Sequence, residues 1–304
     1  MTVNLNEIRE LTIISLFADD ELMDILVLKG GNALELAYKL NSRASMDIDV
    51  SMSKDFEDFG LTIDKVEGKL EYQLNQTFSE KNYQVFDIKI TEKPKHRRTV
   101  DDLNWGGYQV EFKVIHSQDY NRIGKENLEK LRRESLVVTE GDKKVVKVDI
   151  SKYEFTEPSE ETEFKDYIIK VYSPRMIIFE KLRAICQQMK EYTRTVKTSQ
   201  TPRPRDFYDI YIVKENLEPN LDLSDSENLS MIKNFFEVKK VPLNLIGRIG
   251  DAEVRDFHES DYATLVDTVK VSDDLKSFEF YYDYVVELTK ELQPLWDYSS
   301  SSAG

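Results

Sequence analysis

The stretch LVLKGGNALELAYKLNSRASMDIDVSM, residues 26–52, decides the fold of this chain. It begins with a short apolar run that is typical of a buried strand and that ends at a Gly30-Gly31 turn. Apolar residues then recur at helical spacing, with Asn32 as the expected N-cap of the helix. Residues 47–51 alternate between polar and apolar side chains and predict a second strand.

Two aspartates in the second strand, Asp47 and Asp49, are the residues most suited to chemistry. Successive side chains of a strand point to opposite faces, so both carboxylates share one face while Ile48 and Val50 face the core. The aspartates are about 6.5 Å apart along the strand, and their oxygen atoms can reach two Mg²⁺ ions roughly 4 Å apart. The pair therefore predicts a phosphoryl-transfer site.

Residues close to the two aspartates supply groups that bind phosphate. A helix entered through Gly30-Gly31 offers backbone N–H groups and the positive end of its dipole to an anion, although a glycine pair there is more often plain structure. Ser45 is in phase with the aspartates, so its hydroxyl binds phosphate, orients a metal-bound water, or only begins the strand. Arg43 neutralises a triphosphate, braces a carboxylate, or forms a surface ion pair.

The chain beyond this stretch is first rich in strands and then mainly helical. Residues 146–150 place three apolar side chains on one face and Asp149 on the other, so a third carboxylate is available to the same sheet. The polar segment FTEPSEETEF, residues 155–164, is expected to be a linker. Ser173-Pro174 is expected to cap and open a helix, and the helical segments that follow can complete a small bundle.

Length and composition describe an ordinary globular chain. The 304 residues allow two packed domains, and 40% hydrophobic residues allow a sizeable core. No stretch approaches the roughly 20 apolar residues that span a membrane, and the start does not resemble a signal peptide. We therefore expect a cytoplasmic protein with no membrane partner. The single cysteine, Cys186, excludes an intramolecular disulfide and is expected to be buried.

The charge of the chain is unevenly distributed. A formal net charge of -15 argues against a protein that coats nucleic acid nonspecifically. Residues 175–205, here called the basic island, nevertheless contain eight basic residues and two acidic ones. The basic island is either a phosphate-binding patch or a solvated helix face with a flexible basic loop.

Several motifs together resemble a known family. They are the stretch over residues 26–52, Asp149 within KVDIS, an E-K-L-x-A helix that contains Lys181, and an R-D-x-x-D helix that runs from Arg205 to Asp209. In combination they resemble the polymerase-β-like nucleotidyltransferases, and in particular the AbiEii/AbiGii-type toxins of bacterial abortive-infection (phage defence) and toxin–antitoxin systems. The resemblance covers about residues 26–212.

The resemblance implies an α+β fold, in which a polymerase-β-like mixed sheet is flanked by helices and followed by a C-terminal helical bundle. Residues 1–172 would form the nucleotidyltransferase core domain. Residues 173–298 would form a mainly helical domain that contributes Lys181 and the R-D-F-Y-D helix, and residues 299–304 are a low-complexity tail.

The resemblance also implies an enzyme that transfers a nucleoside monophosphate from an NTP and releases pyrophosphate, with Mg²⁺ or Mn²⁺ as cofactor. The implied metal ligands are Asp47, Asp49 and Asp149. In related transferases the third carboxylate binds metal or deprotonates the acceptor hydroxyl, and Glu111 is the rival of Asp149 for that role. The residues implied to contact phosphate are Gly30, Gly31, Arg43, Ser45, Lys181 and Arg205.

The R-D-x-x-D helix supports either catalysis or structure. Asp209 is a catalytic candidate by the resemblance. Asp206 and Asp209 share one helical face, however, and such a pair could serve only to hold the helices of Arg205 and Lys181 together. For Asp206 we favour a brace to Arg205 or Lys181 over metal ligation.

The leading functional hypothesis is a toxin that arrests growth by transferring a nucleotide to tRNA, with a cognate antitoxin, as protein or gene, for its partner. One alternative keeps the chemistry but modifies a small molecule such as an antibiotic. Another is a non-catalytic nucleotide-binding regulatory module, which the presence of both Asp47 and Asp49 disfavours.

Overall fold

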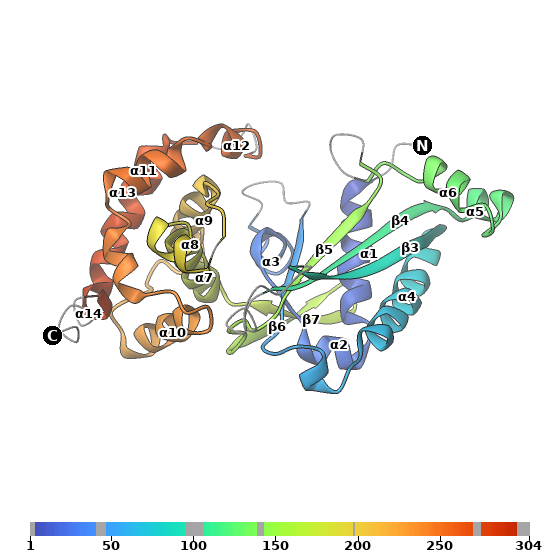
Figure 1. The fold of residues 1–304 in the computed structure, drawn as a ribbon, viewed down its shortest axis with the longest axis horizontal. Helices are drawn as coiled ribbons and strands as arrows, with labels where there is room; N and C mark the ends of the chain where they lie inside the picture. Colours follow the sequence, from blue (N-terminus) through green and yellow to red (C-terminus); the bar gives the residue numbers. More distant parts are fainter. Residues whose placement is uncertain are drawn as a thin grey trace. The chain divides into compact units, whose positions relative to one another are not determined.

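The computed structural model describes residues 4–40, 47–94, 106–138, 143–196, 198–269 and 275–296. The chain divides into two compact units, coloured along the sequence in Figure 1. The first unit takes in Met1–Ala37 and Ser45–Val171, and the second takes in Tyr38–Ala44 and Tyr172–Gly304. The functional roles expected for residues 1–172 and 173–298 stay predictions.

The first unit is built on a seven-stranded mixed sheet (Figure 1). The strand order is β3-β4-β5-β2-β1-β7-β6. The pairs β2–β5 and β1–β7 are parallel, and the pairs β3–β4, β4–β5 and β1–β2 are antiparallel. The strands are β1 Val27–Leu28, β2 Ile48–Ser51, β3 Tyr83–Lys93, β4 Gly107–His116, β5 Val146–Ser151, β6 Ser159–Phe164 and β7 Tyr167–Tyr172.

Helices flank the sheet in the first unit. Helix α1 packs against α4, and α4 packs against β3. The helices of this unit are α1 Leu5–Phe17, α2 Asp20–Ile25, α3 Gly30–Leu36, α4 Ile63–Ser79, α5 Ser117–Ile123 and α6 Leu128–Glu134. The mixed sheet with its flanking helices confirms the expected α+β class.

Two local expectations were wrong. Residues 155–164 are not only a linker, because they contain β6, the last strand in the sheet order. An edge strand with exposed side chains needs no apolar alternation, so its polar composition hid it. Asn32 does not cap α3, which begins at Gly30 with Lys29 as its N-cap. The buried Asn32 side chain instead donates from Nδ2 to the backbone carbonyl of Asp47.

The second unit is helical, as expected. Helix α7 packs against α9 and α10, and α9 packs against α12 and α13. The helices are α7 Pro174–Cys186, α8 Lys190–Val196, α9 Pro204–Asn216, α10 Ser226–Glu237, α11 Ala252–Glu259, α12 Tyr262–Val266, α13 Phe278–Thr289 and α14 Gln293–Trp296. None of the described helices combines the length and the apolar character needed to cross a membrane.

Two expectations about α7 are confirmed. The side chain of Ser173 accepts a hydrogen bond from the backbone N–H of Met176, and Pro174 occupies the first helical position. At the other end of α7, Cys186 is fully buried, and this burial raises the pKa of its thiol.

A buried polar cluster ties together four strands of the sheet. Lys152, which directly follows β5, is 1% exposed, and its Nζ donates to Asp55 and to Glu92 of β3. The hydroxyl of Tyr108, in β4, donates to the other oxygen of Asp55, which lies beyond β2. Burial alone raises the pKa of Asp55, but the hydrogen bonds from Lys152 and Tyr108 outweigh burial and hold that pKa below its ordinary value.

We predict that Lys152→Met lowers the free energy of unfolding by about 3–5 kcal/mol, because it leaves Asp55 buried without its cation. The free energy is measured by urea denaturation at pH 7. The matched control is Lys89→Met, whose lysine is 60% exposed and lies 3.7 Å from Asp87. Loss of the exposed Lys89 leaves Asp87 paired with Arg132 at 2.6 Å, so this lysine should contribute no more than about 1 kcal/mol. Equal stability of the two variants would contradict the prediction.

Candidate functional site

Two carboxylates lie side by side on the polar face of the sheet. Strand β2 pairs in parallel with β5 so that Asp49 is the register partner of Asp149. The residues on either side of each aspartate are buried, and Asp49 is half-buried while Asp149 is exposed. Neighbouring strands are about 4.8 Å apart, so the two negative side chains emerge next to each other. Such a pair favours a bound cation.

Asp47 lies immediately before β2 and is exposed. Its backbone carbonyl accepts the hydrogen bond from Asn32, whose side chain is fully buried in α3. A hydrogen bond therefore joins α3, which follows the glycine turn, to the residue that precedes β2.

The glycine turn lies close to the carboxylate of Asp49. Gly30 has φ +66°, a left-handed conformation that glycine adopts without strain. A Cβ atom at Gly30 would lie 3.6 Å from Oδ2 of Asp49. The backbone N–H of Lys29 donates to the carbonyl of Asp49 at 3.0 Å. Gly31 follows in the first turn of α3.

The two rivals for the third carboxylate lie in different surroundings. Asp149 accepts a hydrogen bond at Oδ1 from the side chain of Gln109 at 2.9 Å. Glu111 is paired in register with Lys147, two residues before Asp149, and forms an ion pair with it at 3.0 Å. Asp149 is thus beside Asp49, while Glu111 lies one strand further from Asp49 and is held by a lysine.

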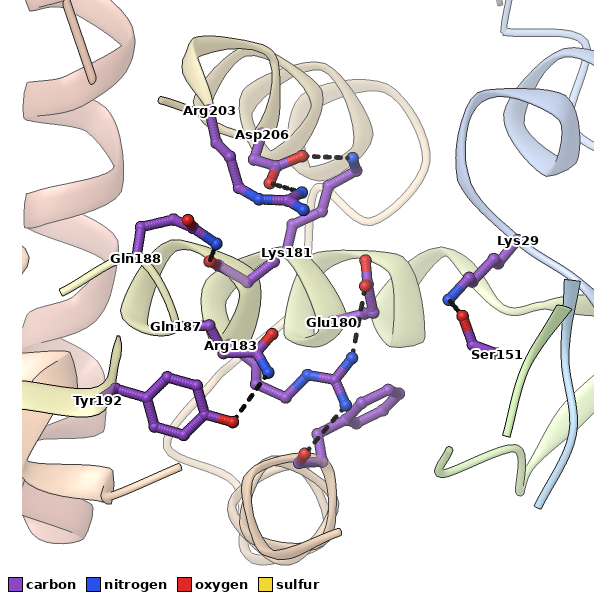
Figure 2. A network of polar contacts seen from close by, with 12 residues as sticks. Lys29, Ser151, Glu180, Lys181, Arg183, Gln187, Gln188, Tyr192, Arg203 and Asp206 are labelled. Atoms are coloured by element: carbon purple, nitrogen blue, oxygen red, sulfur yellow. Dashed lines mark hydrogen bonds and ion pairs between the residues drawn. The ribbon is translucent and has the colours of Figure 1, made fainter. Parts of the chain in front are cut away.

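Sequence reasoning missed Lys29. Its Nζ donates to the hydroxyl of Ser151 at 3.1 Å, a contact drawn in Figure 2. Ser151 follows Asp149 by two residues in β5 and so shares its face of the sheet. The signal was present in the sequence, because Lys29 directly precedes the glycine turn and Ser151 alternates with Asp149.

Two residues of the expected site, Arg43 and Ser45, lie outside the described residues. Within the described ranges, no group of three or more histidine, cysteine, aspartate or glutamate side chains is arranged to hold a metal ion. The oxygen donors of Asp49 and Asp149 are nevertheless of the kind that Mg²⁺ prefers, since Mg²⁺ commonly takes one or two carboxylates together with substrate phosphates and water.

The second unit contains a buried ionic cluster that includes the predicted Lys181 and Asp209. Nζ of Lys181 lies 3.0 Å from Oδ1 of Asp206 and 2.8 Å from Oδ2 of Asp209. Asp206 also pairs with Arg203 at 3.0 Å (Figure 2). Lys181 is 4% exposed and Asp209 is fully buried. Burial raises the pKa of Asp206, but Lys181 and Arg203 outweigh it and the pKa lies below its ordinary value.

The expected brace between Asp206 and Lys181 is confirmed. The other expected partner, Arg205, instead donates to the backbone carbonyl of Thr264 at 3.2 Å. The basic island is not a single solvated face, because Lys181 and Arg183 are both buried.

His258 supports this cluster through the backbone. Its Nδ1 accepts a hydrogen bond from the backbone N–H of Arg203 at 2.9 Å, which requires the neutral imidazole. Burial lowers the pKa of His258 to about 4; the charge of Asp206 opposes this shift, and the charge of Arg203 adds to it.

We predict that His258 makes the protein less stable in mild acid. Its pKa of about 4 in the folded chain lies below the ordinary value of 6.5. The unfolded chain therefore binds more protons between these values, and the stability present above pH 6.5 is lost as the pH falls towards 4. Urea midpoints at pH 7 and pH 5 should differ less for His258→Gln than for the unchanged protein. The same difference in both proteins would count against a neutral His258.

Comparison with known proteins identifies the class of enzyme. A family model described as nucleotidyl transferase AbiEii toxin, Type IV TA system, matches residues 14–284. The chain is a nucleotidyltransferase. It belongs to the AbiEii toxin family, as the sequence motifs predicted.

A solved structure also shows similarity. The crystal structure of an antigenic nucleotidyltransferase-like protein from Paracoccidioides brasiliensis is 15% identical in sequence, with a TM-score of 0.33. The match covers 77% of this chain and 93% of that chain. No curated protein matches the sequence.

Proposed function

We propose that this chain is the toxin of a toxin–antitoxin system that transfers a nucleoside monophosphate from an NTP to RNA, with tRNA as the acceptor. Growth arrest during phage infection would follow from the loss of functional tRNA. The proposal rests on one observation: Asp49 and Asp149 lie in register on adjacent strands, with the Gly30 turn against Asp49, in a member of this family.

Mg²⁺, with Mn²⁺ as a substitute, fits the donor set of this site. Asp47 and Asp49 would hold the ion, with Asp149 beside them. When bound, the ion would neutralise charge that develops on the phosphate oxygens during transfer.

The reaction exchanges one phosphorus–oxygen bond for another. The acceptor hydroxyl oxygen forms a bond to the α-phosphorus of the NTP. The bond between the α-phosphorus and the oxygen that bridges to the β-phosphate breaks, and pyrophosphate leaves with that oxygen and its electron pair. Asp149 is suited to receive the hydroxyl proton, because Gln109 orients one of its oxygen atoms and the side chain is exposed.

The family resemblance assigns further roles to the second unit. Lys181 and Arg205 would contact phosphate, and Asp209 would act in catalysis. The buried pairing of Lys181 with two aspartates fixes the position of its ammonium group. A cognate antitoxin would be the protein or gene partner that relieves the growth arrest.

We predict that Asp49→Asn and Asp149→Asn each lower the rate of nucleotide transfer by about 10²-fold or more, because each removes a charge at the reacting phosphate. Radiolabelled NTPs and total RNA provide the assay, with circular dichroism to establish folding. Glu111→Gln is the matched control and should retain most activity. If Glu111→Gln is inactive while Asp149→Asn is active, Glu111 is the third carboxylate.

EDTA should abolish transfer, and added Mg²⁺ should restore it.

We predict that the label appears in tRNA when the purified protein is incubated with each of the four labelled NTPs and total cellular RNA. Expression should arrest growth, and Asp49→Asn should relieve the arrest. Labelling of an added aminoglycoside, with unlabelled RNA and normal growth, would refute the RNA acceptor and leave the transferase chemistry intact. Undiminished toxicity of a folded Asp49→Asn protein would instead point to a binding function.

A further inference from the structure

We infer that Lys29 binds the triphosphate of the incoming nucleotide and that Ser151 holds its ammonium group in position for this contact. The inference rests on the proposed function and adds a residue to the nucleotide site. It is carried by the backbone position of Lys29, by the direction of its side chain and by the kind of partner it has.

The backbone places Lys29 beside Asp49. Strand β1 pairs with β2 so that Leu28 is the register partner of Val50. The next residue, Lys29, donates its N–H to the carbonyl of Asp49 at 3.0 Å. Leu28 and Val50 are buried, and successive side chains alternate, so Lys29 leaves the sheet on the same face as Asp49.

The side chain of Lys29 runs across that face. Its Nζ reaches the hydroxyl of Ser151 at 3.1 Å. Ser151 is the register partner of Ser51 on β2, and β2 lies between β1 and β5 in the sheet. The side chain therefore reaches across β2 and brings its positive charge to the row of Ser51 and Ser151, two residues along the strands from Asp49 and Asp149. Figure 2 shows the contact between Lys29 and Ser151.

The partner of Lys29 differs from those of two more deeply buried lysines, Lys152 and Lys181. Nζ of Lys152 is bound by the carboxylates of Asp55 and Glu92. Nζ of Lys181 likewise lies between two aspartates. The half-buried Lys29 is held by the neutral hydroxyl of Ser151. An ammonium group has three donors, so two remain for an anion.

The geometry also specifies which anion fits. The Gly30 turn, which follows Lys29 directly, lies against the carboxylate of Asp49. A cation on the same face of the sheet as two carboxylates and next in sequence to a glycine turn suits a ligand that brings both phosphate oxygens and a metal ion, which is the composition of a metal–triphosphate complex. Lys29 would contact the oxygens of the triphosphate, and the aspartates would contact its metal.

The experiment compares Lys29→Met, Lys29→Arg and Ser151→Ala with the matched control Lys54→Met, in which an exposed lysine of the same unit is changed. Isothermal titration with Mg²⁺ measures the affinity for the α,β-methylene analogue of each NTP and for the four nucleosides. Lys29→Met should weaken binding of the triphosphate analogue about tenfold or more, since a charge-assisted hydrogen bond is lost. Nucleoside binding should be unchanged.

Lys29→Arg should recover much of the lost affinity because it retains the charge, and Ser151→Ala should weaken binding by about two- to fivefold, because the ammonium group is no longer held. Lys54→Met should bind as the unchanged protein does. In the transfer assay, Lys29→Met should raise KM for the NTP. Urea denaturation establishes that each variant folds. If Lys29→Met does not fold, Lys29→Gln takes its place.

The outcomes separate this inference from the proposed function. If the unchanged protein and folded Lys29→Met bind the triphosphate analogue equally well, the inference is wrong and the transferase proposal stands. If Lys29→Met and Lys29→Arg both lose nucleoside as well as triphosphate binding, Lys29 has a structural role. If the unchanged protein binds no triphosphate analogue, the proposed function and the inference fail together.

Discussion

The parallel pairing of β2 with β5 is the constraint on which the candidate site depends. It places Asp49 and Asp149 on neighbouring strands at the same level, where two like charges repel each other. The repulsion is tolerated because the pairing is locked beyond the ends of both strands, where Lys152 joins Asp55 in a buried cluster. The buried cluster of Lys152 and Asp55 therefore makes one end of the strand pair rigid. The negative charge of Asp49 and Asp149 is on the face of the strands that is open to solvent.

The sequence predicted what local patterns determine. Alternation along β5 placed Asp149 opposite the apolar face, and Ser173-Pro174 marked the start of α7. It could not predict that β5 would be the neighbour of β2, because strand pairing is set by packing between segments far apart in the chain. Asn32 was misassigned for a similar reason: its amide is bonded to Asp47, a partner that appears only when the chain folds.

The basic residues illustrate the same limit. The spacing of Asp206 and Asp209 predicted that the two share a helical face, and both contact Lys181. Which arginine would pair with Asp206 depended on geometry instead, and Arg203, just before the helix, takes that place. Composition assigned Lys181 to a basic island, although the fold buries it. The net charge of a segment therefore does not tell which of its basic residues are available to bind an anion until their burial is known.

The buried state of Cys186 has a practical consequence. Since this is the single cysteine of the chain and its thiol is enclosed and hard to ionise, maleimide dyes will react slowly with the native protein. Two cysteines introduced at exposed positions would then be the reactive thiols. Paired labels, one on each unit, would allow single-molecule energy transfer to follow the distance between the units as nucleotide is added, without first removing a native cysteine.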